Sequence, residues 1–421
     1  MKKIIFVLMF TVLGVLSACT TTPEEEISNE YVSLQAGYHH AVALDQEGNV
    51  FTWGSSFYGV LGNGVSDIDE MEITPINITE NFDLEDGEMI VKIVVGDYTN
   101  FAITNTSRVF VWGWNVLGQL GVNNQEIISE PLEITERLNL SDNETVTQIS
   151  TKSHTLILTS TSRVIAFGNN ADGQLGLGDS TDQTRTMYAS TPVDITKNFP
   201  LLPNETIDYV HVGNEGFSLT ITSLNRVLYF GRVTQYDRIE TPSEVGVNLN
   251  LNSEETITSS YEGNYPALLS SEGRIFYLFR SISFPSPFVE INGIELSNAL
   301  NLDDNDSVLN MVLGYRSNGV VITESGQIFP FGDNRNERLG FESSTSMIVP
   351  PFVKSSQAYT SVHEALSLED GETVLSVSLG NHFITLVTSE NRIFTWGINN
   401  LGVLGNGTTD NQTRPTEIQL P

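Results

Sequence analysis

A short motif that recurs along the whole chain restricts the fold more than any other feature of the sequence. Phe51-Thr-Trp-Gly54 is followed by the glycine-rich turn Gly59-Val-Leu-Gly62, and versions of this pair of elements recur at intervals of roughly 50 to 65 residues. The aromatic-glycine pairs are Trp53-Gly54, Trp112-Gly113, Phe167-Gly168, Phe230-Gly231, Phe331-Gly332 and Trp396-Gly397, with Phe279 at the same place in a degenerate unit. A drifting period of this size indicates repeated supersecondary units with loops of variable length.

Each unit contains four short segments with strand character. An alternating stretch such as His40–Leu44 leads into a polar turn, where Gly48, Asn225 or Asn391 suits the positive φ of a tight hairpin. A strand ending in glycine comes before this stretch, and the aromatic-glycine strand follows the turn. The fourth segment contains proline, as in Thr74-Pro-Ile-Asn-Ile78, and proline is confined to the edges of sheets. The unit is therefore expected to be four hairpin-connected strands with the proline segment at the edge.

Four-stranded units repeated around an axis form a β-propeller. The sequence predicts an all-β, seven-bladed β-propeller over residues 31–421. The first unit begins at Tyr31 without a Pro-x-x-Ile segment before it, and the last unit ends with Pro415-Thr-Glu-Ile418. We therefore expect the C-terminal strand to pair with the first blade, which would close the ring and remove its open edges.

The combined motifs resemble the repeats of the regulator of chromosome condensation family. The first unit carries most of the pattern, in Gly37, His40, Ala43, Leu44, Trp53, Gly54, Gly59, Leu61, Gly62 and Gly64. The resemblance implies a seven-bladed propeller in which the Trp or Phe packs between blades and the glycine lets backbones approach closely. The motif histidine is replaced by Thr99, Gly216 and Phe383 in the second, fourth and seventh units, so no shared histidine chemistry is expected.

The N-terminus indicates export. Lys2 and Lys3 precede the apolar run Ile4–Leu16, which has the length of a signal-peptide core rather than of a membrane span. The segment ends in Leu16-Ser-Ala-Cys19, which resembles the bacterial lipobox, and Cys19 is the only cysteine. The expected organisation is a lipoprotein signal peptide over 1–18, a lipid on Cys19, an acidic tether over 19–30, and the propeller. Two acyl chains suffice for stable anchoring at the extracytoplasmic membrane face or cell surface. The alternative is an ordinary signal peptide with an incidental cysteine.

Charge limits the classes of partner. The chain has 20 Lys and Arg against 52 Asp and Glu, for a net charge of −32. Such a surface repels phosphate backbones, so nucleic acid is not expected as a partner. Export also argues against guanine-nucleotide exchange on a small GTPase, which is the least favoured function.

No catalytic, metal or cofactor site is predicted. The sequence has no metalloprotease or nucleophile-elbow motif, and His40 and His154 lie on the repeat register, which favours a packing role. The acidic stretch Asn301–Val308 resembles a calcium loop by itself. Related stretches precede other units, however, so its acids are expected to cap or solvate a turn.

Arginines that recur in the turn register, such as Arg108 and Arg163, are interpreted as scaffold. Other arginines, with aromatic residues nearby, lie in the degenerate fourth to sixth units, and such groups are typical of binding hot spots. The residues proposed for partner binding are Arg232, Tyr236, Arg238, Arg280, Phe284, Phe288, Arg335 and Arg338. The alternative is neutral drift of these units.

The sequence thus favours a lipid-anchored, non-catalytic scaffold that binds an unknown extracellular protein or glycan and contacts the membrane only through Cys19. One alternative is an extracellular enzyme inhibitor, because the repeats are similar to those of a secreted β-lactamase-inhibiting propeller. Another is an extracellular lyase or hydrolase that uses the central channel of the propeller.

Overall fold

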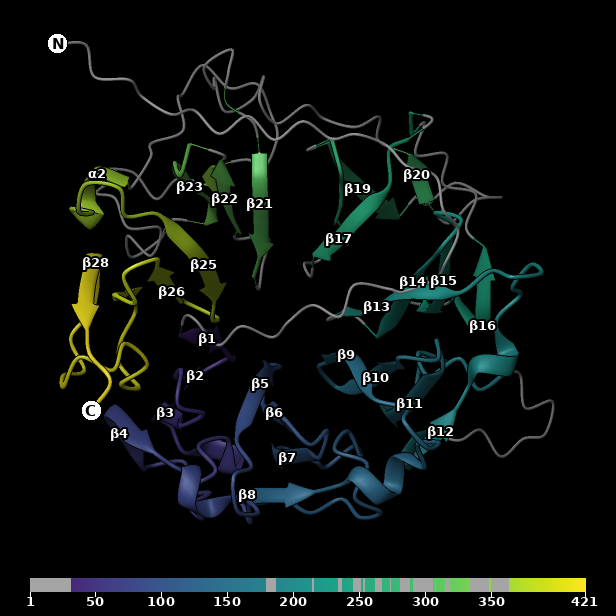
Figure 1. Ribbon diagram of the computed structural model, residues 1–421, viewed down its shortest axis with the longest axis horizontal. Coiled ribbons are helices and arrows are strands. Elements are labelled where there is room, and N and C mark those ends of the chain that lie inside the picture. The colour runs from purple at the N-terminus through teal and green to yellow at the C-terminus, as the bar shows by residue number, and fades with distance from the viewer. Residues whose placement is uncertain are drawn as a thin grey trace, which may run out of the picture.

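A computed structural model describes most of the chain from Val32 to Pro421. The residues outside the description are 1–31, 179–186, 214–215, 234–236, 245–250, 253, 262–266, 273, 281–287, 291–305, 307, 315–318, 324, 334–347 and 350–362. Figure 1 shows the strands arranged in blades around a centre, with the first and last blades side by side.

The strands follow one another in groups of four. The first group is β1 (Ser33–Ala36), β2 (His40–Leu44), β3 (Val50–Ser55) and β4 (Met71–Asn77). The next three are β5 (Ile90–Val95), β6 (Thr99–Thr104), β7 (Val109–Gly113), β8 (Ile128–Glu133); β9 (Val146–Thr151), β10 (His154–Thr159), β11 (Val164–Asn169), β12 (Tyr188–Asp194); and β13 (Ile207–Gly213), β14 (Phe217–Thr222), β15 (Val227–Arg232), β16 (Arg238–Glu244).

The remaining strands complete the order. They are β17 (Ile257–Tyr261), β18 (Ala267–Ser270), β19 (Ile275–Arg280), β20 (Phe288–Glu290); β21 (Val308–Leu313), β22 (Gly319–Thr323), β23 (Ile328–Asp333), β24 (Ile348–Val349); and β25 (Val374–Leu379), β26 (Phe383–Thr388), β27 (Ile393–Gly397), β28 (Gln412–Ile418). Short helices lie in connections: η1 (Phe57–Gly59), η2 (Thr79–Asn81), η3 (Thr135–Leu138), η4 (Thr196–Asn198) and α2 (His363–Leu366).

Strand pairing groups these strands into antiparallel sheets of four consecutive members. Six groups have four strands of at least three residues each. The group β21 to β24 ends in the two-residue strand Ile348–Val349, which pairs only with Gly332 and Asp333. Four-stranded blades are thus confirmed, while the seven complete blades predicted are corrected to six within the described residues.

The predicted closure by strand exchange is wrong. β28 pairs with β27 in its own blade, and the first blade is completed by its own β4. The proline segment of each unit therefore forms the outer strand of that same unit, as the edge-strand prediction requires. The first and last blades instead meet through an apolar cluster and hydrogen bonds. Phe51 and Trp53 pack in one cluster with Ile393 and Leu404, and the Trp53 indole donates to the Val403 carbonyl at 2.9 Å.

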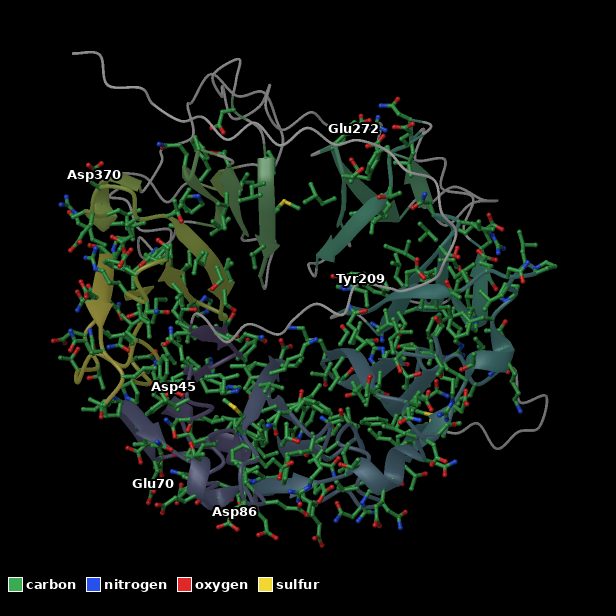
Figure 2. The ribbon with its side chains drawn as sticks, viewed as in Figure 1. Asp45, Glu70, Asp86, Tyr209, Glu272 and Asp370 are labelled. Atoms are coloured by element: carbon green, nitrogen blue, oxygen red, sulfur yellow. The ribbon has the colours of Figure 1, made fainter. Side chains whose placement is uncertain are left out.

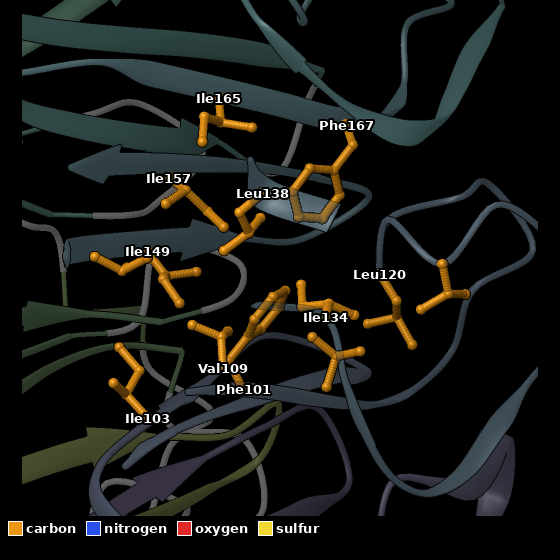
Figure 3. Close-up of a cluster of buried hydrophobic side chains, with 13 residues drawn as sticks. Phe101, Ile103, Val109, Leu120, Ile134, Leu138, Ile149, Ile157, Ile165 and Phe167 are labelled. Atoms are coloured by element: carbon orange, nitrogen blue, oxygen red, sulfur yellow. The ribbon is translucent and has the colours of Figure 1, made fainter. Parts of the chain in front are cut away.

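Apolar side chains fill the space between neighbouring blades. Figure 3 shows the cluster between the second and third blades, where Phe101 and Val109 face Ile149, Ile157 and Phe167. The motif aromatics belong to these clusters, and Trp53, Trp112, Phe167, Phe230 and Trp396 are fully buried. Their predicted packing between blades is confirmed. Phe331 and Gly332 lie on β23, but their side-chain environment is outside the described part of the structure.

The motif glycines and the hairpin turns adopt the predicted conformations. Gly113 has φ +109°, and a Cβ there would lie 2.3 Å from the Tyr98 carbonyl oxygen. Gly54, Gly168, Gly231 and Gly397 repeat this arrangement. Turn positions between the second and third strands have positive φ even where the residue is serine, at Ser107 and Ser162.

The histidine register needs one correction in the fourth blade. His40 lies opposite Gly54 and His154 opposite Gly168, whereas Gly231 lies opposite Phe217. Phe217, and not Gly216, therefore occupies the motif position, because the turn that follows Gly213 is one residue longer there. The Phe217 ring lies over Gly213, as the His40 ring lies over Gly37.

Candidate interaction surface

Because the strands of a blade are antiparallel and joined by hairpins, each blade has two ends that carry different turns and loops. We call the end that carries the turn between the second and third strands, together with the connections between blades, the clamp end. The opposite end carries the turn between the first and second strands and the loop between the third and fourth, and we call it the loop end. Both ends are built on the same repeated backbone, so their side chains can be compared blade by blade.

One type of ion pair recurs at the clamp end of the blades. In five blades of the described structure, a turn arginine reaches a buried glutamate in the connection that precedes the blade. These pairs are Arg108–Glu88, Arg163–Glu144, Arg226–Glu205, Arg274–Glu255 and Arg392–Glu372. The glutamate side chains are at most 1% exposed.

Glu144 illustrates how the carboxylate is satisfied. Its oxygens accept the backbone N–H of Ser141 at 2.8 Å, the hydroxyls of Thr159 and Thr161 at 2.5 and 2.6 Å, and Arg163 Nη1 at 2.6 Å. Burial by itself would raise the carboxyl pKa, but these hydrogen bonds outweigh it and lower the pKa to about 2. All acceptor positions are used within the scaffold, so this end has a structural role.

The structure bears on the predictions for the turn arginines and for the acids of the connections. The turn arginines are scaffold, although they are bound to buried acids rather than lying free on the surface. In these five connections, the last acid caps a turn, as expected, and is also the partner of the arginine. In the acidic stretch Asn301–Val308, only Asp306 and Val308 are described, and Asp306 accepts hydrogen bonds from the Ser325 amide and hydroxyl.

The loop end of the first two blades carries a continuous cluster of half-buried rings. We call it the aromatic patch; it consists of Tyr38, His39, Phe57, Tyr58, Tyr98 and Trp114. Tyr58 is central, with its ring centroid 3.6 Å from that of Phe57, 5.2 Å from Tyr98 and 5.5 Å from Trp114. Tyr38 lies 5.1 Å from Tyr98 and extends the patch toward the inner strands.

Backbone hydrogen bonds between turns and loops position these rings. The Tyr38 amide donates to the Asp97 carbonyl of the next blade at 2.8 Å, and the Trp114 amide donates to the Tyr98 carbonyl at 2.8 Å. The residues come from two turns and two loops of adjacent blades, so the patch exists only when both blades are packed together. It is therefore a preformed surface rather than a property of one loop.

Tyr58 has a strained backbone. Its φ of +63° and ψ of +17° lie in the left-handed region, which costs a residue with a Cβ roughly 1 kcal/mol. Its counterparts in neighbouring loops, Leu117 and Asp172, are not among the described positive-φ residues. The strain thus coincides with the centre of the patch, which is where functional constraints tend to concentrate.

One ion pair lies next to the patch. Lys152 Nζ contacts Asp97 Oδ1 at 2.5 Å and links the turns of the second and third blades. Burial lowers the pKa of His39 below its usual value of 6.5, so this ring is neutral at pH 7. The patch is consequently an aromatic, uncharged surface with a charge pair at its border.

Of the residues predicted for partner binding, Arg232 and Arg238 have described side chains, and neither belongs to the aromatic patch. Arg232 is paired with Asp172 at 2.6 Å, and Arg238 contacts Glu240 at 3.4 Å and the Ala171 carbonyl at 3.1 Å. Both arginines therefore contact the loop of the preceding blade. Tyr236, Phe284, Arg335 and Arg338 lie outside the described residues, and Arg280 and Phe288 are placed only as strand positions.

The histidine expectation is confirmed. His40 is fully buried and its Nε2 lies 2.7 Å from Asn100 Oδ1 of the next blade, while His154 Nε2 lies 2.7 Å from Ser218 Oγ. Burial, the largest effect, lowers the pKa of His40 to about 4 and of His154 to about 3. Both rings connect adjacent blades in their neutral form.

The described residues contain no candidate metal cluster and no membrane-spanning helix. No group of three or more His, Cys, Asp or Glu side chains there could hold a metal ion. Within the same residues, no helix has the length and apolar character needed to cross a membrane. Cys19 and the expected signal peptide lie outside the described part of the chain.

Known protein families contain repeats that match those of this chain. Two family models described as the regulator of chromosome condensation (RCC1) repeat match, one over residues 31–60 and 90–119 and the other over 47–103, 107–158 and 390–421. The ultraviolet-B receptor UVR8 of Arabidopsis thaliana is 30% identical over 39% of this chain and 34% of its own length. The X-linked retinitis pigmentosa GTPase regulator homolog of Caenorhabditis elegans is 25% identical over 89% of this chain and 24% of its own length.

This chain therefore spans only about a quarter to a third of these curated relatives. Among solved structures, human WBSCR16 superposes with a TM-score of 0.66 at 19% identity, covering 89% of this chain and 94% of that chain, which supports the fold alone. The sequence matches and the strand pairing lead to the same conclusion: the chain carries RCC1 repeats on a β-propeller of four-stranded antiparallel blades.

Proposed function

We propose that this protein is a non-catalytic scaffold that binds another protein through the aromatic patch at its loop end. The observation that carries the proposal is the cluster of six half-buried rings around the strained Tyr58. Tyr and Trp are the residues most enriched in binding hot spots, and contiguous exposed apolar surface is uncommon on a monomer without a partner. One relative is named a GTPase regulator homolog, and because a GTPase is itself a protein, this name supports a protein partner.

The scaffold is further proposed to be a lipoprotein, anchored through Cys19 on the extracytoplasmic face of a bacterial membrane. The support is the sequence Leu16-Ser-Ala-Cys19 after an apolar run. Expression of the full chain and of Cys19→Ser in a bacterium, with radioactive palmitate, tests this. We expect label and membrane association only with Cys19; equal partitioning of the two chains into the soluble fraction would contradict the anchor.

Photocrosslinking tests the binding surface. A photoreactive phenylalanine analogue at Val116, which is 44% exposed in the loop that carries Trp114, should capture a saturable protein partner from intact cells or their surroundings. The control position is Leu224, 54% exposed in a turn at the clamp end. Capture from Val116 but not from Leu224 supports the proposal. Equal capture from both, or retention only on polysaccharide, contradicts protein binding by the patch.

A captured partner also separates the remaining functional classes. Titration of the purified protein against a captured hydrolase would show the inhibitor function through lowered turnover. A captured small GTPase would instead be assayed for nucleotide release. In either case, Trp114→Ala should weaken the effect while Leu224→Ala leaves it unchanged.

A further inference from the structure

We infer that the aromatic patch binds positively charged side chains, arginine or lysine, of a basic protein segment. This inference rests on the proposed function and names the chemistry of the partner. It follows from the ring geometry, the contrast between the two ends of the blades, and the charge of the molecule.

The rings of the patch stay partly exposed instead of closing into a buried core. Tyr58 and Trp114 are nearly parallel, with 29° between their planes, whereas Tyr98 is edge-on to both at 82° and 79°. All three rings are half-buried. The face of an aromatic ring carries negative charge density, and a guanidinium or ammonium group within about 6 Å of the ring centre is attracted to it.

The clamp end shows the same chemistry already satisfied within the chain. Arg108 lies over the Phe110 ring at 4.9 Å, Arg274 over Phe276 at 5.0 Å, and Arg392 over Phe394 at 4.8 Å. Each of these arginines is also paired with a buried glutamate. Of the cation–π contacts in the described residues, none involves Tyr58 or Trp114. Within the described part of the chain, Tyr58 and Trp114 at the loop end therefore have no arginine stacked on them.

Charge then favours a cationic partner over a neutral or anionic one. The chain has a net charge of −32, and Figure 2 shows labelled acids such as Glu70, Asp86 and Asp370 around the outer rim. Such a field attracts basic segments and speeds their encounter, while the uncharged rings provide a local contact. A neutral glycan would gain nothing from this field, and an anionic polymer would be repelled.

Tryptophan fluorescence provides a direct readout of the patch. Three of the four tryptophans, Trp53, Trp112 and Trp396, are fully buried, and Trp114 alone is half-buried in the patch. The probe is a synthetic peptide of alternating glycine and arginine, titrated into the full-length protein. The matched peptide contains citrulline, which keeps the shape of arginine without its charge.

We expect the arginine peptide to change the fluorescence saturably and the citrulline peptide to leave it unchanged. By calorimetry, Tyr58→Ala and Trp114→Ala should each weaken binding about 2- to 30-fold, the range of one cation–π contact. These substitutions leave the net charge unaltered, so binding by diffuse charge would be unaffected by them. Leu224→Ala is the control, and Trp114→Phe should restore most of the affinity.

Equal affinity of the variants and the parent for the arginine peptide would overturn the inference, and so would equal binding of the citrulline peptide. The result is separable from that of the proposed function. If a partner crosslinks at Val116 but the arginine peptide does not bind, the scaffold stands and the cationic chemistry is wrong. Circular dichroism of each variant checks that the fold is intact.

Discussion

The clamp end and the loop end of the blades share one backbone and differ in how their side chains vary. At the clamp end, the same glutamate and arginine recur from blade to blade, and Arg108, Arg163 and Arg226 each pair with two acidic side chains. At the loop end, the positions equivalent to Tyr58 hold Leu117, Asp172 and Leu401. Repetition of side chains accompanies a structural role, whereas variation on a constant backbone accompanies binding.

The difference has a physical origin. A buried carboxylate must be matched by donors in every blade that contains it, so the whole set of contacts is repeated together. A half-exposed ring at the loop end has no such requirement from the scaffold. The scaffold therefore does not account for the strained backbone of Tyr58, which agrees with the proposed binding role of the patch.

The largest effect is expected at the clamp. Arg163→Ala leaves the carboxylate of Glu144 buried without its cation, and we expect a loss of about 3 kcal/mol in the free energy of unfolding. Asp194 is the outer partner of Arg163, and its side chain is 44% exposed. Asp194→Asn removes only this charge and should lower the free energy of unfolding by less than about 1 kcal/mol. Urea denaturation followed by fluorescence measures both. Similar losses for the two variants would show that the buried pair is no more important than a surface pair.

The second-largest effect is expected from the buried histidines, which make the free energy of unfolding depend on pH. Burial lowers the pKa of His154 to about 3, so the unfolded chain, with a pKa of 6.5, takes up the proton first as the pH falls. Stability is therefore complete above pH 6.5 and falls by about 1.4 kcal/mol per pH unit between pH 6.5 and 3 for this histidine alone. Clamp carboxylates such as Glu144, with a pKa of about 2, lose their contribution only below pH 4.5.

The interval from pH 6.5 to 4.5 therefore isolates the histidines. Phe217 and Phe383 occupy the same register as His154, which makes His154→Phe a tolerated change. This variant should flatten the pH dependence of the unfolding free energy by about 1.4 kcal/mol per unit in that interval. An unchanged slope would mean that His154 is not buried in its neutral form.

These two predictions concern residues whose burial the sequence indicated only in part. The four-strand unit, the positive-φ turn at Ser107 and the proline edge at Pro75 follow from local rules, because hairpin conformation depends on neighbouring residues. The prediction that β28 pairs with the first blade is wrong, because the pairing of strands that are distant in sequence does not follow from local rules. The repeat pattern gave no sign that Glu88 and Arg108 meet, although both recur in register.

The aromatic patch was missed for a related reason. Phe57, Tyr58 and Trp114 lie in the most regular units, whose glycine-rich turns predict structure alone, whereas the arginine and aromatic pattern of a binding site points to the degenerate units. Tyr38 and Tyr98 join them only through packing of two blades. The available indication was that aromatics occupy turn positions where other units have Leu, Asn or Asp.

The third prediction concerns the close approach of backbones that supports the loop end. Gly113→Ala places a Cβ 2.3 Å from the Tyr98 carbonyl at φ +109°, so strain and a clash should together cost about 2 kcal/mol or more. Gly87→Ala is the matched control, since φ is +79° there and no atom lies within 4 Å of the added Cβ. Its cost should be about 1 kcal/mol, from the backbone alone. Equal melting temperatures of the two variants would show that the contact with Tyr98 is easily relaxed.

The smallest change in stability, and the sharpest test of the contrast between the ends, is expected for Tyr58→Asn. Asparagine tolerates the left-handed backbone, so relief of strain should offset the lost ring contacts and leave the free energy of unfolding within about 1 kcal/mol of the parent. Binding at the patch should nevertheless fall, because the central ring is gone. Denaturation and peptide titration on the same preparation measure the two quantities. A clear loss of stability with unchanged binding would assign Tyr58 to the scaffold and remove the functional distinction between the loop end and the clamp end.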